Sequence, residues 1–469
     1  MKQPQPSTHP LESLLQQHCP NGVEFKELGE LFTIKNGYTP SKAKAEFWES
    51  GSIPWFRMED IQKNGRILKD SIQHITPQAV KGKLFPANSI IIATTATIGE
   101  HALVIVDYLS NQQFTCLIPQ VNCCEQLNMK FMFYYGFILG EWCRNNVNKS
   151  AFPSVKMDKF KKLKIPLPPL EIQYKIVEIL DAFTELQAEL QAELEARLKQ
   201  YHYYRNKLLS HDELENRTAK YRQKADSSPN APSLSLRASE ASVAIHKETP
   251  LEPQKVDSSV KVDCHDFAAA KSRNDSDPAT LVPYVRLGEI GKRNAGTKIT
   301  AHQMQALHKE NAPIRIFAGG STIADVDYRD LPKKDVIDKP SIICKARGYI
   351  GFEYYDKPFS HKSEFWSYTI EKNANQKFIY YFLVNQQEYF QQIAKANSVK
   401  IPQLKVKNTD KFQIPLPPLE VQNEIVELLD KFDTLTNDLT SGIPAEIEAR
   451  KKQYEHYRER LLSFKEQGK

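Results

Sequence analysis

The sequence lacks the features that would place it in a membrane or in an oxidising compartment. Its longest apolar stretch, residues 131–140, ends at Glu141, whereas a membrane-spanning helix needs about 20 apolar residues. The N-terminus has no apolar signal core. The 7 cysteines are odd in number and form no Cys-x-x-Cys pair, which argues against a disulfide framework and against structural zinc. We therefore expect a cytoplasmic protein that contacts no membrane and holds no metal.

The motifs of common nucleotide-binding and hydrolytic enzymes are also missing. None of the 18 glycines lies in Gly-x-Gly, and no phosphate-cradling Gly-rich loop ending in Gly-Lys-Ser/Thr occurs. His-Glu-x-x-His and Gly-x-Ser-x-Gly are absent, which removes the usual metalloprotease and hydrolase arrangements. No proline precedes an aspartate, and both Pro-Pro pairs lie in Leu-Pro-Pro-Leu, so the usual patterns of nucleases and adenine methyltransferases are missing. We expect no catalytic residues and no cofactor site in this chain.

What the sequence does contain is an internal repeat. Residues 165–181, IPLPPLEIQYKIVEILD, recur at 414–430 as IPLPPLEVQNEIVELLD, with 13 of 17 positions identical. A second block, residues 195–210, matches residues 448–463 at 11 of 16 positions. Upstream, residues 89–99 parallel residues 341–351 in the same order. Each half is therefore expected to be a divergent domain followed by a near-identical tail.

The tails have the periodicity of long helices. Their apolar residues recur in steps of four and three, which is the spacing of a coiled-coil seam. Pro168 and Pro169 form a helix-entry turn, so the first helix should begin near Leu170 and run to about Ser210, roughly 60 Å. Gly442 and Pro444 should interrupt and restart the second helix. The seam residues, predicted to pack helix against helix, are Ile172, Ile176, Phe183, Leu186, Leu190, Leu194, Val421, Ile425, Leu428, Phe432, Leu435 and Leu439.

The remaining segments complete the domain organisation. The parts upstream of the tails combine short β-type runs with many turn residues, so we expect an α+β fold with two mixed domains. Residues 211–280 are rich in Ser, Ala, Asp and Pro and are expected to be a flexible linker. The predicted parts are a first domain (1–164), a first helical spacer (165–210), the linker (211–280), a second domain (281–413) and a second helical spacer (414–469).

The net charge of +6 is unevenly distributed over these parts. The first domain has 19 basic and 14 acidic residues, and the second has 21 and 13. The first tail, the linker and the second tail carry −2, −2 and −3. Two basic domains joined by acidic helices fit two sites on one phosphate backbone and a separate protein-binding spacer, although solvated lysine faces would give a similar balance.

Two variable domains that alternate with two near-identical Pro-Leu-Pro-Pro-Leu-Glu-x-Gln tails resemble the specificity subunits of type I restriction-modification systems. The residues that carry the resemblance are Leu28-Gly29-Glu30, the turn at 36–41, Ile53-Pro54-Trp55, residues 93–99 and the tail ends at 201–205 and 454–458. The resemblance implies two target recognition domains, each reading one half of a split site in double-stranded DNA. It further implies that the tails pack antiparallel as a spacer with pseudo-twofold symmetry.

The resemblance also implies partners. Two methyltransferase subunits would bring S-adenosylmethionine and methylate adenine at N6. Restriction subunits would join through them and cut DNA with ATP and Mg²⁺. The chain itself would be a non-catalytic subunit.

Candidate DNA-contacting residues combine cations for phosphates with amide and hydroxyl groups for base edges. An Asn-Gly turn, solvated surface charges or buried structural amides would explain the same residues without DNA, and these alternatives stay open. The candidates in the first domain are Lys35, Asn36, Tyr38, Thr39, Ser41, Lys42, Arg57, Arg66, Asn111, Gln112 and Gln113. Those in the second domain are Lys292, Arg293, Asn294, Lys298, Lys345, Arg347, His361 and Lys362.

Two other functions compete with DNA recognition. One is an enzyme that cuts or modifies DNA alone through an active site that the motifs do not reveal. The other is a coiled-coil adaptor for proteins only. Activity of the purified chain on DNA would indicate the first, and failure to retard a DNA duplex would indicate the second.

A short tandem repeat in the first tail generates a prediction about spacing. Gln187-Ala188-Glu189-Leu190 is followed directly by Gln191-Ala192-Glu193-Leu194. Four residues extend a helix by about 6 Å, against about 3.4 Å per base pair, so deleting or duplicating one unit should shift the unread DNA spacer by about one or two base pairs. Both half-sites should stay unchanged. Sequencing of methylated genomic DNA from cells carrying these variants checks this, and altered half-sites with a constant spacer would contradict it.

Overall fold

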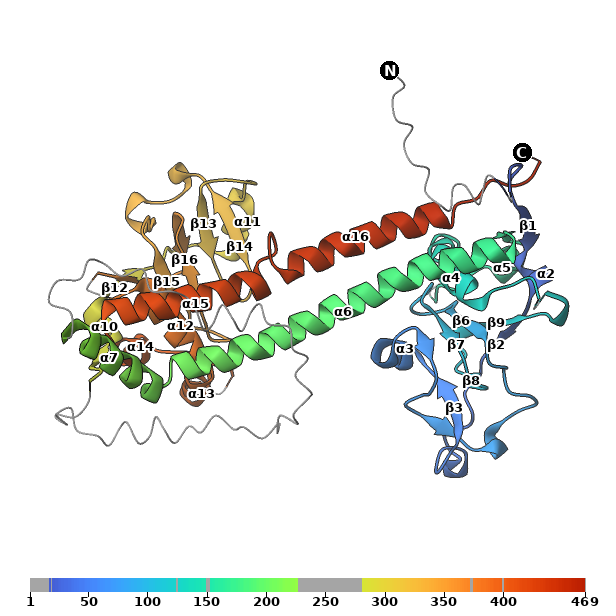
Figure 1. The fold of residues 1–469 in the computed structure, drawn as a ribbon, viewed down its shortest axis with the longest axis horizontal. Coiled ribbons are helices and arrows are strands. Elements are labelled where there is room, and N and C mark those ends of the chain that lie inside the picture. The colour runs from blue at the N-terminus through green and yellow to red at the C-terminus, as the bar shows by residue number, and fades with distance from the viewer. Residues whose placement is uncertain are drawn as a thin grey trace, which may run out of the picture. The chain divides into compact units, whose positions relative to one another are not determined.

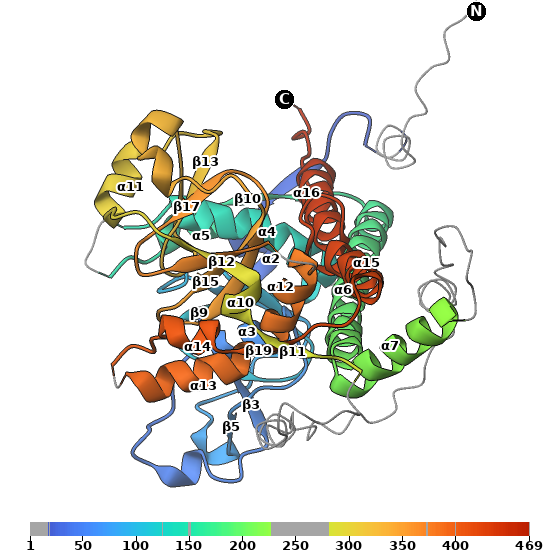
Figure 2. The ribbon, with the colours of Figure 1, turned by 90° about the vertical axis from the view of Figure 1, so that its left-hand side faces the viewer.

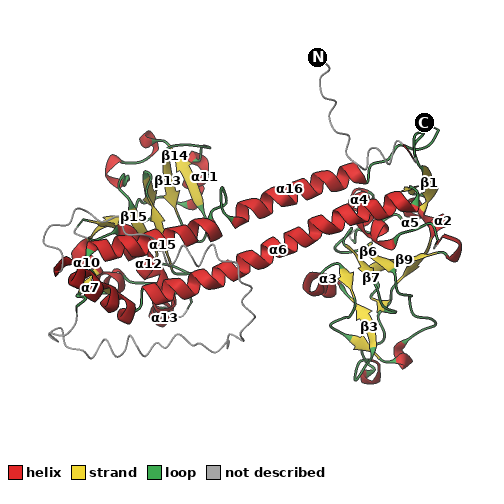
Figure 3. Ribbon diagram, in the orientation of Figure 1, coloured by secondary structure: helices red, strands yellow, loops and turns green. Residues whose placement is uncertain are grey.

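The structure, a computed structural model, describes residues 17, 19–123, 125–148, 152–226, 281–371, 374–398 and 400–468. The chain divides into two units, residues 1–192 with 446–469 and residues 193–445. Each unit therefore joins one domain, the tail segment that directly follows it, and the end of the other tail. Sheets and helices occur together in both units (Figures 1 and 3), which confirms the predicted α+β fold.

The first unit is built on a five-stranded sheet in the order β2-β9-β6-β7-β4. Every pairing in it is antiparallel except that of β4 with β7. A smaller sheet has the order β5-β3-β8. The strand bounds are β2 Phe32–Asn36, β9 Phe114–Pro119, β6 Ser89–Ala93, β7 His101–Val104, β4 Ile67–Leu68, β5 His74–Ile75, β3 Ile53–Phe56 and β8 Leu109–Ser110.

Strand β6 lies between two hydrophobic cores. Ile90 and Ile92 pack in one core with helix α4 (Met129–Asn145), whereas Ile91 and Ala93 pack in a second core with the smaller sheet. Successive residues of a strand point to opposite faces, so a strand covered on both faces reads as the unbroken apolar run Ile-Ile-Ile-Ala.

The second unit repeats this layout. Its larger sheet has the order β12-β18-β15-β16 and its smaller sheet the order β14-β13-β17. Helix α12 (Gln376–Asn385) takes the place of α4, and β13 runs parallel to β17 as β3 does to β8. The strand bounds are β12 Gly291–Ala295, β18 Trp366–Ile370, β15 Ser341–Lys345, β16 Gly351–Tyr355, β14 Ile323–Val326, β13 Ile314–Phe317 and β17 Phe359–His361. The weak sequence repeat upstream of the tails therefore corresponds to a repeat of the same strands in the two domains.

Each domain is tied at its base to the tail that follows it. Strand β1 pairs with β10, and β11 pairs with β19. The repeated Leu-Gly-Glu forms a short helix there, and the carboxylate of Glu30 accepts a hydrogen bond from the Glu27 amide at 3.1 Å. The remaining elements are β1 Glu24–Glu27, β10 Lys164–Leu167, β11 Tyr284–Arg286, β19 Gln413–Pro415, α2 Leu28–Leu31, α3 Met58–Asn64, α5 Met157–Lys161, α10 Leu287–Ile290, α11 Ala301–Leu307, α13 Gln387–Asn397, α14 Val406–Asp410, η1 Ala45–Phe47, η2 Pro77–Ala79, η3 Val121–Cys123, η4 Tyr328–Asp330 and η5 Lys333–Asp335.

The tails are helices, as predicted. Helix α6 spans Leu170–Leu208, and the second tail consists of α15 (Leu419–Asn437) and α16 (Ile443–Leu461). The predicted break at Gly442 is confirmed. A side chain on Gly442 would collide with the carbonyl oxygens of Thr434 and Asp438, so this tight junction requires glycine. None of the described helices is both long enough and apolar enough to span a membrane.

Within each unit, the start of one tail packs against the end of the other. Phe183 stacks on Tyr457 in the first unit, with ring centroids 5.4 Å apart. In the second unit Tyr204 stacks on Phe432 at the same separation. The two helices of the first unit run in opposite directions (Figure 1), as the antiparallel spacer requires.

Burial along the predicted seam is graded. The fully buried members are Ile172, Ile176, Val421, Ile425 and Phe432. The half-buried members are Phe183, Leu186, Leu190, Leu194, Leu428 and Leu435.

One seam residue was predicted wrongly. Leu439 is 76% exposed because α15 ends at Asn437. The helical spacing on which its prediction rested no longer applies beyond that point.

Two side chains of the repeat, a buried glutamine and a half-buried aspartate, attach each tail to its domain. The amide oxygen of Gln173 accepts a hydrogen bond from the Asn128 backbone amide at 2.8 Å, and its nitrogen donates to the carbonyls of Gln126 and Pro168, both at 2.8 Å. Asn128 is the N-cap of α4. Two turns later, Asp181 accepts hydrogen bonds from Lys130 and Tyr134, each at 2.7 Å.

The second unit has the same arrangement. Gln422 accepts from the amide of Asn375, the N-cap of α12, at 2.8 Å and donates to the Pro417 carbonyl at 2.7 Å. Asp430 accepts from Lys377 at 2.7 Å and from Tyr381 at 2.6 Å. We call each set of contacts, centred on Gln173 with Asp181 or on Gln422 with Asp430, a tail clamp.

The start of the predicted flexible linker is instead an ordered helix, α7, which spans His211–Asp226. It leaves the end of α6 at an angle (Figure 2). Leu214 and Thr218 are buried, and Arg217 pairs with Glu424 at 2.8 Å. The carboxylate of Glu215 accepts hydrogen bonds from the amides of residues 281 and 282, both at 2.9 Å. The linker prediction is wrong for residues 211–226, and residues 227–280 lie outside the described residues.

The tail clamp generates a stability prediction. Gln173→Ala leaves the Asn128 amide and the Gln126 and Pro168 carbonyls without their partner, the last of these in a buried setting, so it should lower the free energy of unfolding of the first unit by about 3 kcal/mol. Gln191→Ala, at an exposed position of the same helix, should change it by less than about 0.5 kcal/mol. Urea unfolding of both variants measures the difference. Equal stability of the two variants would contradict the role of the clamp.

Candidate nucleic-acid interface

The strand register gathers distant parts of the first domain at one end of its large sheet. Asn36 lies opposite Thr115, Ala93 opposite Phe114, and Ile92 opposite His101. Strands β2 and β6 therefore end where β7 and β9 begin. We call this the loop end of the sheet. The turn after β2 and the segment 111–113 before β9 both lie there, so the fold brings together the predicted residues Asn36, Thr39 and Asn111 to Gln113.

Hydrogen bonds organise these polar side chains. Asn36 accepts from the Thr115 hydroxyl at 3.0 Å. Thr39 donates to the side-chain oxygen of Gln112. Asn111 accepts from the Gln113 amide at 3.1 Å. Gln112 is exposed. The loop end therefore exposes amide groups whose positions are fixed by hydrogen bonds to neighbouring side chains.

The turn after β2 packs closely on the segment before β9. The amide of Gly37 donates to the Phe114 carbonyl at 3.0 Å, and that of Tyr38 donates to the Ser110 carbonyl at 2.8 Å. A side chain at Gly37 would collide with the carbonyl oxygens of Ser110 and Asn111. Gly37 is therefore required by packing, and its close contact sets the position of the polar residues around it.

The other candidates of the first domain divide into exposed and engaged side chains. Lys35, Ser41 and Lys42 are exposed. The Tyr38 hydroxyl accepts from the Lys81 amide at 2.6 Å. Arg57 is half-buried and pairs with Glu59 at 3.0 Å.

Arg66 is engaged within the domain. Its guanidinium donates to the His101 carbonyl at 2.9 Å and pairs with Glu100 at 2.6 Å. It also lies 5.3 Å from the centre of the Phe137 ring. These contacts attach the segment before β4 to the start of β7.

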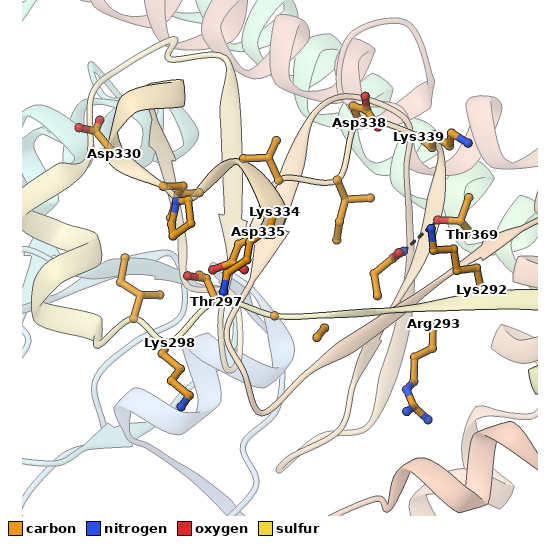
Figure 4. A pocket seen from close by; sticks show the side chains of 18 of the residues that line it. Lys292, Arg293, Thr297, Lys298, Asp330, Lys334, Asp335, Asp338, Lys339 and Thr369 are labelled. Atoms are coloured by element: carbon orange, nitrogen blue, oxygen red, sulfur yellow. Dashed lines mark hydrogen bonds between the residues drawn. The ribbon is translucent and has the colours of Figure 1, made fainter.

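The second domain has a groove of about 920 Å³ along the same strand and turn. Its lining includes the predicted residues Lys292, Arg293, Asn294 and Lys298. Figure 4 shows Thr297 and Lys298 at one end of this segment and Lys292 and Arg293 at the other. A lysine side chain is a mobile point charge suited to phosphate oxygens.

The opposite wall of the groove was not predicted. It is formed by residues 330–339 and contributes Lys334 and Lys339 together with Asp335 and Asp338. Their mixed charges lie in an irregular segment without periodicity, so no sequence signal distinguishes them from ordinary surface residues.

Several second-domain candidates have partners within the domain. Arg293 pairs with Asp410 at 2.6 Å, Lys345 with Glu353 at 2.6 Å, and Lys362 with Glu364 at 3.1 Å. Asn294 donates to the Thr369 hydroxyl at 2.9 Å. Arg347 and Lys298 are exposed.

His361 was predicted wrongly as a DNA contact. It is fully buried, and a ring nitrogen lies 3.2 Å from the Ser367 hydroxyl. Burial lowers the pKa of its imidazole to about 4, so the ring is neutral near pH 7. The amide of Thr297 donates to its carbonyl at 2.7 Å, which makes His361 a support for the turn after β12. Its neighbours Ser360 and Lys362 gave the sequence a misleading polar context.

No group of three His, Cys, Asp or Glu side chains that could hold a metal ion occurs among the described residues. The predicted residues that are exposed at the loop ends carry cations, amides and hydroxyls, and the groove of the second domain adds the carboxylates of Asp335 and Asp338. Cations, amides and hydroxyls bind phosphates and base edges.

Comparison with known proteins decides the family. A family model described as type I restriction modification DNA specificity domain matches residues 20–200 and 282–449. The type I restriction enzyme EcoprrI specificity subunit of Escherichia coli is 37% identical over 433 residues, covering 89% of each chain. The chain belongs to the type I restriction-modification specificity subunits. The resemblance recognised in the sequence is thereby confirmed.

Other similarities cover different shares of this specificity subunit. The EcoR124I/EcoR124II specificity subunit of Escherichia coli is 37% identical over 202 residues, which is 40% of this chain and 48% of that protein. A chain from a structural study of complex assembly and conformational transition of the type I R-M system aligns with a TM-score of 0.52. It is 15% identical and covers 94% of this chain and 98% of that chain, which shows a shared fold. Within the family, this chain has the role of DNA specificity.

The burial of His361 generates a prediction about pH. The unfolded histidine binds a proton below about pH 6.5 and the folded one only below about 4, so His361 should cost the second unit up to about 3 kcal/mol of stability as the pH falls through this window. His361→Gln should be less stable than the wild type at pH 7, and this difference should shrink towards pH 4.5. Urea unfolding at both pH values measures it. A difference independent of pH would contradict the buried, neutral histidine.

Proposed function

We propose that each domain of this specificity subunit reads one half of a bipartite target in double-stranded DNA. The observation that carries the proposal is the duplicated frame. Strands β2-β9-β6-β7 of the first large sheet have the same order as β12-β18-β15-β16 of the second, and both sheets place a polar turn, after β2 or after β12, at the loop end. The side chains on the two frames differ, as Lys35 to Lys42 and Lys292 to Lys298 illustrate. Two equivalent frames with different side chains suit two different half-sites.

We propose further that the tails bind two methyltransferase subunits. The tail clamps explain why Gln and Asp recur in both copies, but they do not explain repeated residues that are exposed. Glu178 and Glu427 occupy equivalent positions and are both exposed, as are Glu195 and Glu448. Identical exposed side chains in two copies fit two identical partner surfaces.

The partners would supply the chemistry. The methyltransferase subunits would bring S-adenosylmethionine and methylate adenine at N6. Restriction subunits, joined through them, would use ATP and Mg²⁺ to cut DNA. The purified chain incubated with DNA, Mg²⁺ and S-adenosylmethionine should then be inert, which separates this proposal from a stand-alone enzyme.

The groove of the second domain allows a direct test of DNA binding. In Lys292→Ala/Lys298→Ala, affinity for target DNA should fall by about ten-fold, and the slope of log affinity against log salt should become shallower by about 1 for each phosphate that the variant no longer binds. Lys357→Ala removes an exposed lysine of the same domain outside the groove and should behave as the wild type. Fluorescence anisotropy over a salt series measures both quantities. Wild-type binding and slope in the double variant would contradict the proposed interface.

A further inference from the structure

Each unit carries a pair of joined loops at the loop end of its large sheet. In the second unit, the loop between β15 and β16 is bound to residues 402–404. The amide of Gly348 donates to the Pro402 carbonyl and that of Leu404 to the Ala346 carbonyl, both at 2.8 Å. In the first unit, the amide of Val155 donates to the Thr94 carbonyl at 3.0 Å. An isolated β-bridge joins Arg347 to Gln403 in the second unit, and one joins Thr95 to Ser154 in the first. The two loop pairs are therefore joined in the same way.

In the second unit, the loop between β15 and β16 is fixed by hydrogen bonds to a side chain of helix α13. Gln391 accepts from the Ile350 amide at 2.8 Å and donates to the Gly348 carbonyl at 3.3 Å. Ile350 is fully buried. Gly348 has φ +79°, and its counterpart Ala96 has φ +58°, so both loops make the same left-handed turn.

The two hydrogen-bonded loops expose large apolar side chains to solvent. Tyr349 is 79% exposed and Ile401, on the joined loop, 46%. The exposed pair is not a local accident, because Phe152, which stands before Pro153 as Ile401 stands before Pro402, is 89% exposed. Preorganised aromatic side chains presented to solvent are typical of binding contacts. We call Arg347, Tyr349, Lys400 and Ile401 the prong.

The charge around the prong favours a polyanion over a protein surface. Residues 345–351 and 400–405 contain no acidic residue and four cations, of which Lys345 pairs with Glu353 while the other three are Arg347, Lys400 and Lys405. Arg347 and Lys400 are exposed. Exposed cations beside an apolar contact match a DNA groove, in which phosphates flank the base edges.

The prong also lies at the same end of the sheet as the groove. Cys344 and Ala295 both lie opposite Trp366, at the start of β18. The β15–β16 loop and the turn after β12 therefore emerge from the same sheet end. One DNA segment lying across this end would meet the lysines of the groove and the prong together.

We propose that the prong contacts the half-site read by the second domain, with Tyr349 and Ile401 against base edges and Arg347 and Lys400 on flanking phosphates. This rests on the proposed function and adds residues that determine specificity. The counterparts of the two apolar residues are Thr97 and Phe152. A constant loop pair with different side chains at its tip gives the two domains different readouts, because apolar groups recognise the thymine methyl and deformable base steps.

The test uses the full chain assembled with its methyltransferase subunit and a duplex containing the target identified by methylation sequencing. Tyr349→Ala should weaken target binding by about ten-fold or more, with binding to unrelated duplex unchanged. Tyr349→Phe should stay within about three-fold of the wild type, because it keeps the apolar ring. Tyr328→Ala removes an exposed tyrosine of the same domain that belongs neither to the prong nor to the groove lining and should bind as the wild type does.

Three outcomes overturn the inference. The first is target binding by Tyr349→Ala equal to that of the wild type. The second is an equal loss on target and unrelated duplex, which would make the prong a non-specific contact. The third is loss of methyltransferase co-purification in Tyr349→Ala, which would make the prong a protein-docking element. A wild-type complex that binds no duplex specifically would instead refute the proposed function. Melting temperatures of the variants equal to that of the wild type exclude misfolding as the cause.

Discussion

The buried glutamine of each tail is the contact on which the rest of the structure depends. Gln173 and Gln422 are fully buried, and their hydrogen bonds join the Pro-Pro turn, the first turn of their own helix and the N-cap of α4 or α12. A buried amide must have partners on both its oxygen and its nitrogen, so it tolerates one geometry. Asp181 and Asp430 add a second attachment two turns along. Each recognition domain is therefore set on its tail in the same way.

The parts of the chain that could be predicted from the sequence are those with a regular local pattern. The tails are regular, so their periodicity predicted α6, the break at Gly442 and the buried seam members Ile172 and Ile425. The α+β class followed from composition and turn signals. The strand order did not, because it depends on pairings between short strands far apart in the sequence, which leave no local pattern. Helix α7 was missed because a polar composition outweighed the spacing of Leu214, Thr218 and Tyr221, which is the signal that would have revealed it.

The candidate interface was predicted in part for the same physical reason. The turn around Gly37 and the amides near Gln112 form a group because strand ends meet at the loop end, and the Asn-Gly signal was local and readable. The prediction for His361 was wrong because the sequence does not show that every residue of β17 is buried. Lys334 and Tyr349 were missed because a charge or an aromatic ring in an irregular segment has no periodicity against which to judge it. Such tips are where the two domains differ, since the frame beneath them is the same in both.

The two equivalent domains give one chain the means to read two separate DNA segments. Hydroxyl-radical footprinting of the chain assembled with its methyltransferase subunit on target DNA tests this most directly. We expect two protected segments separated by a less protected spacer, with only the segment read by the second domain weakened by Lys292→Ala/Lys298→Ala. A single protected segment, or equal weakening of both segments, would contradict it.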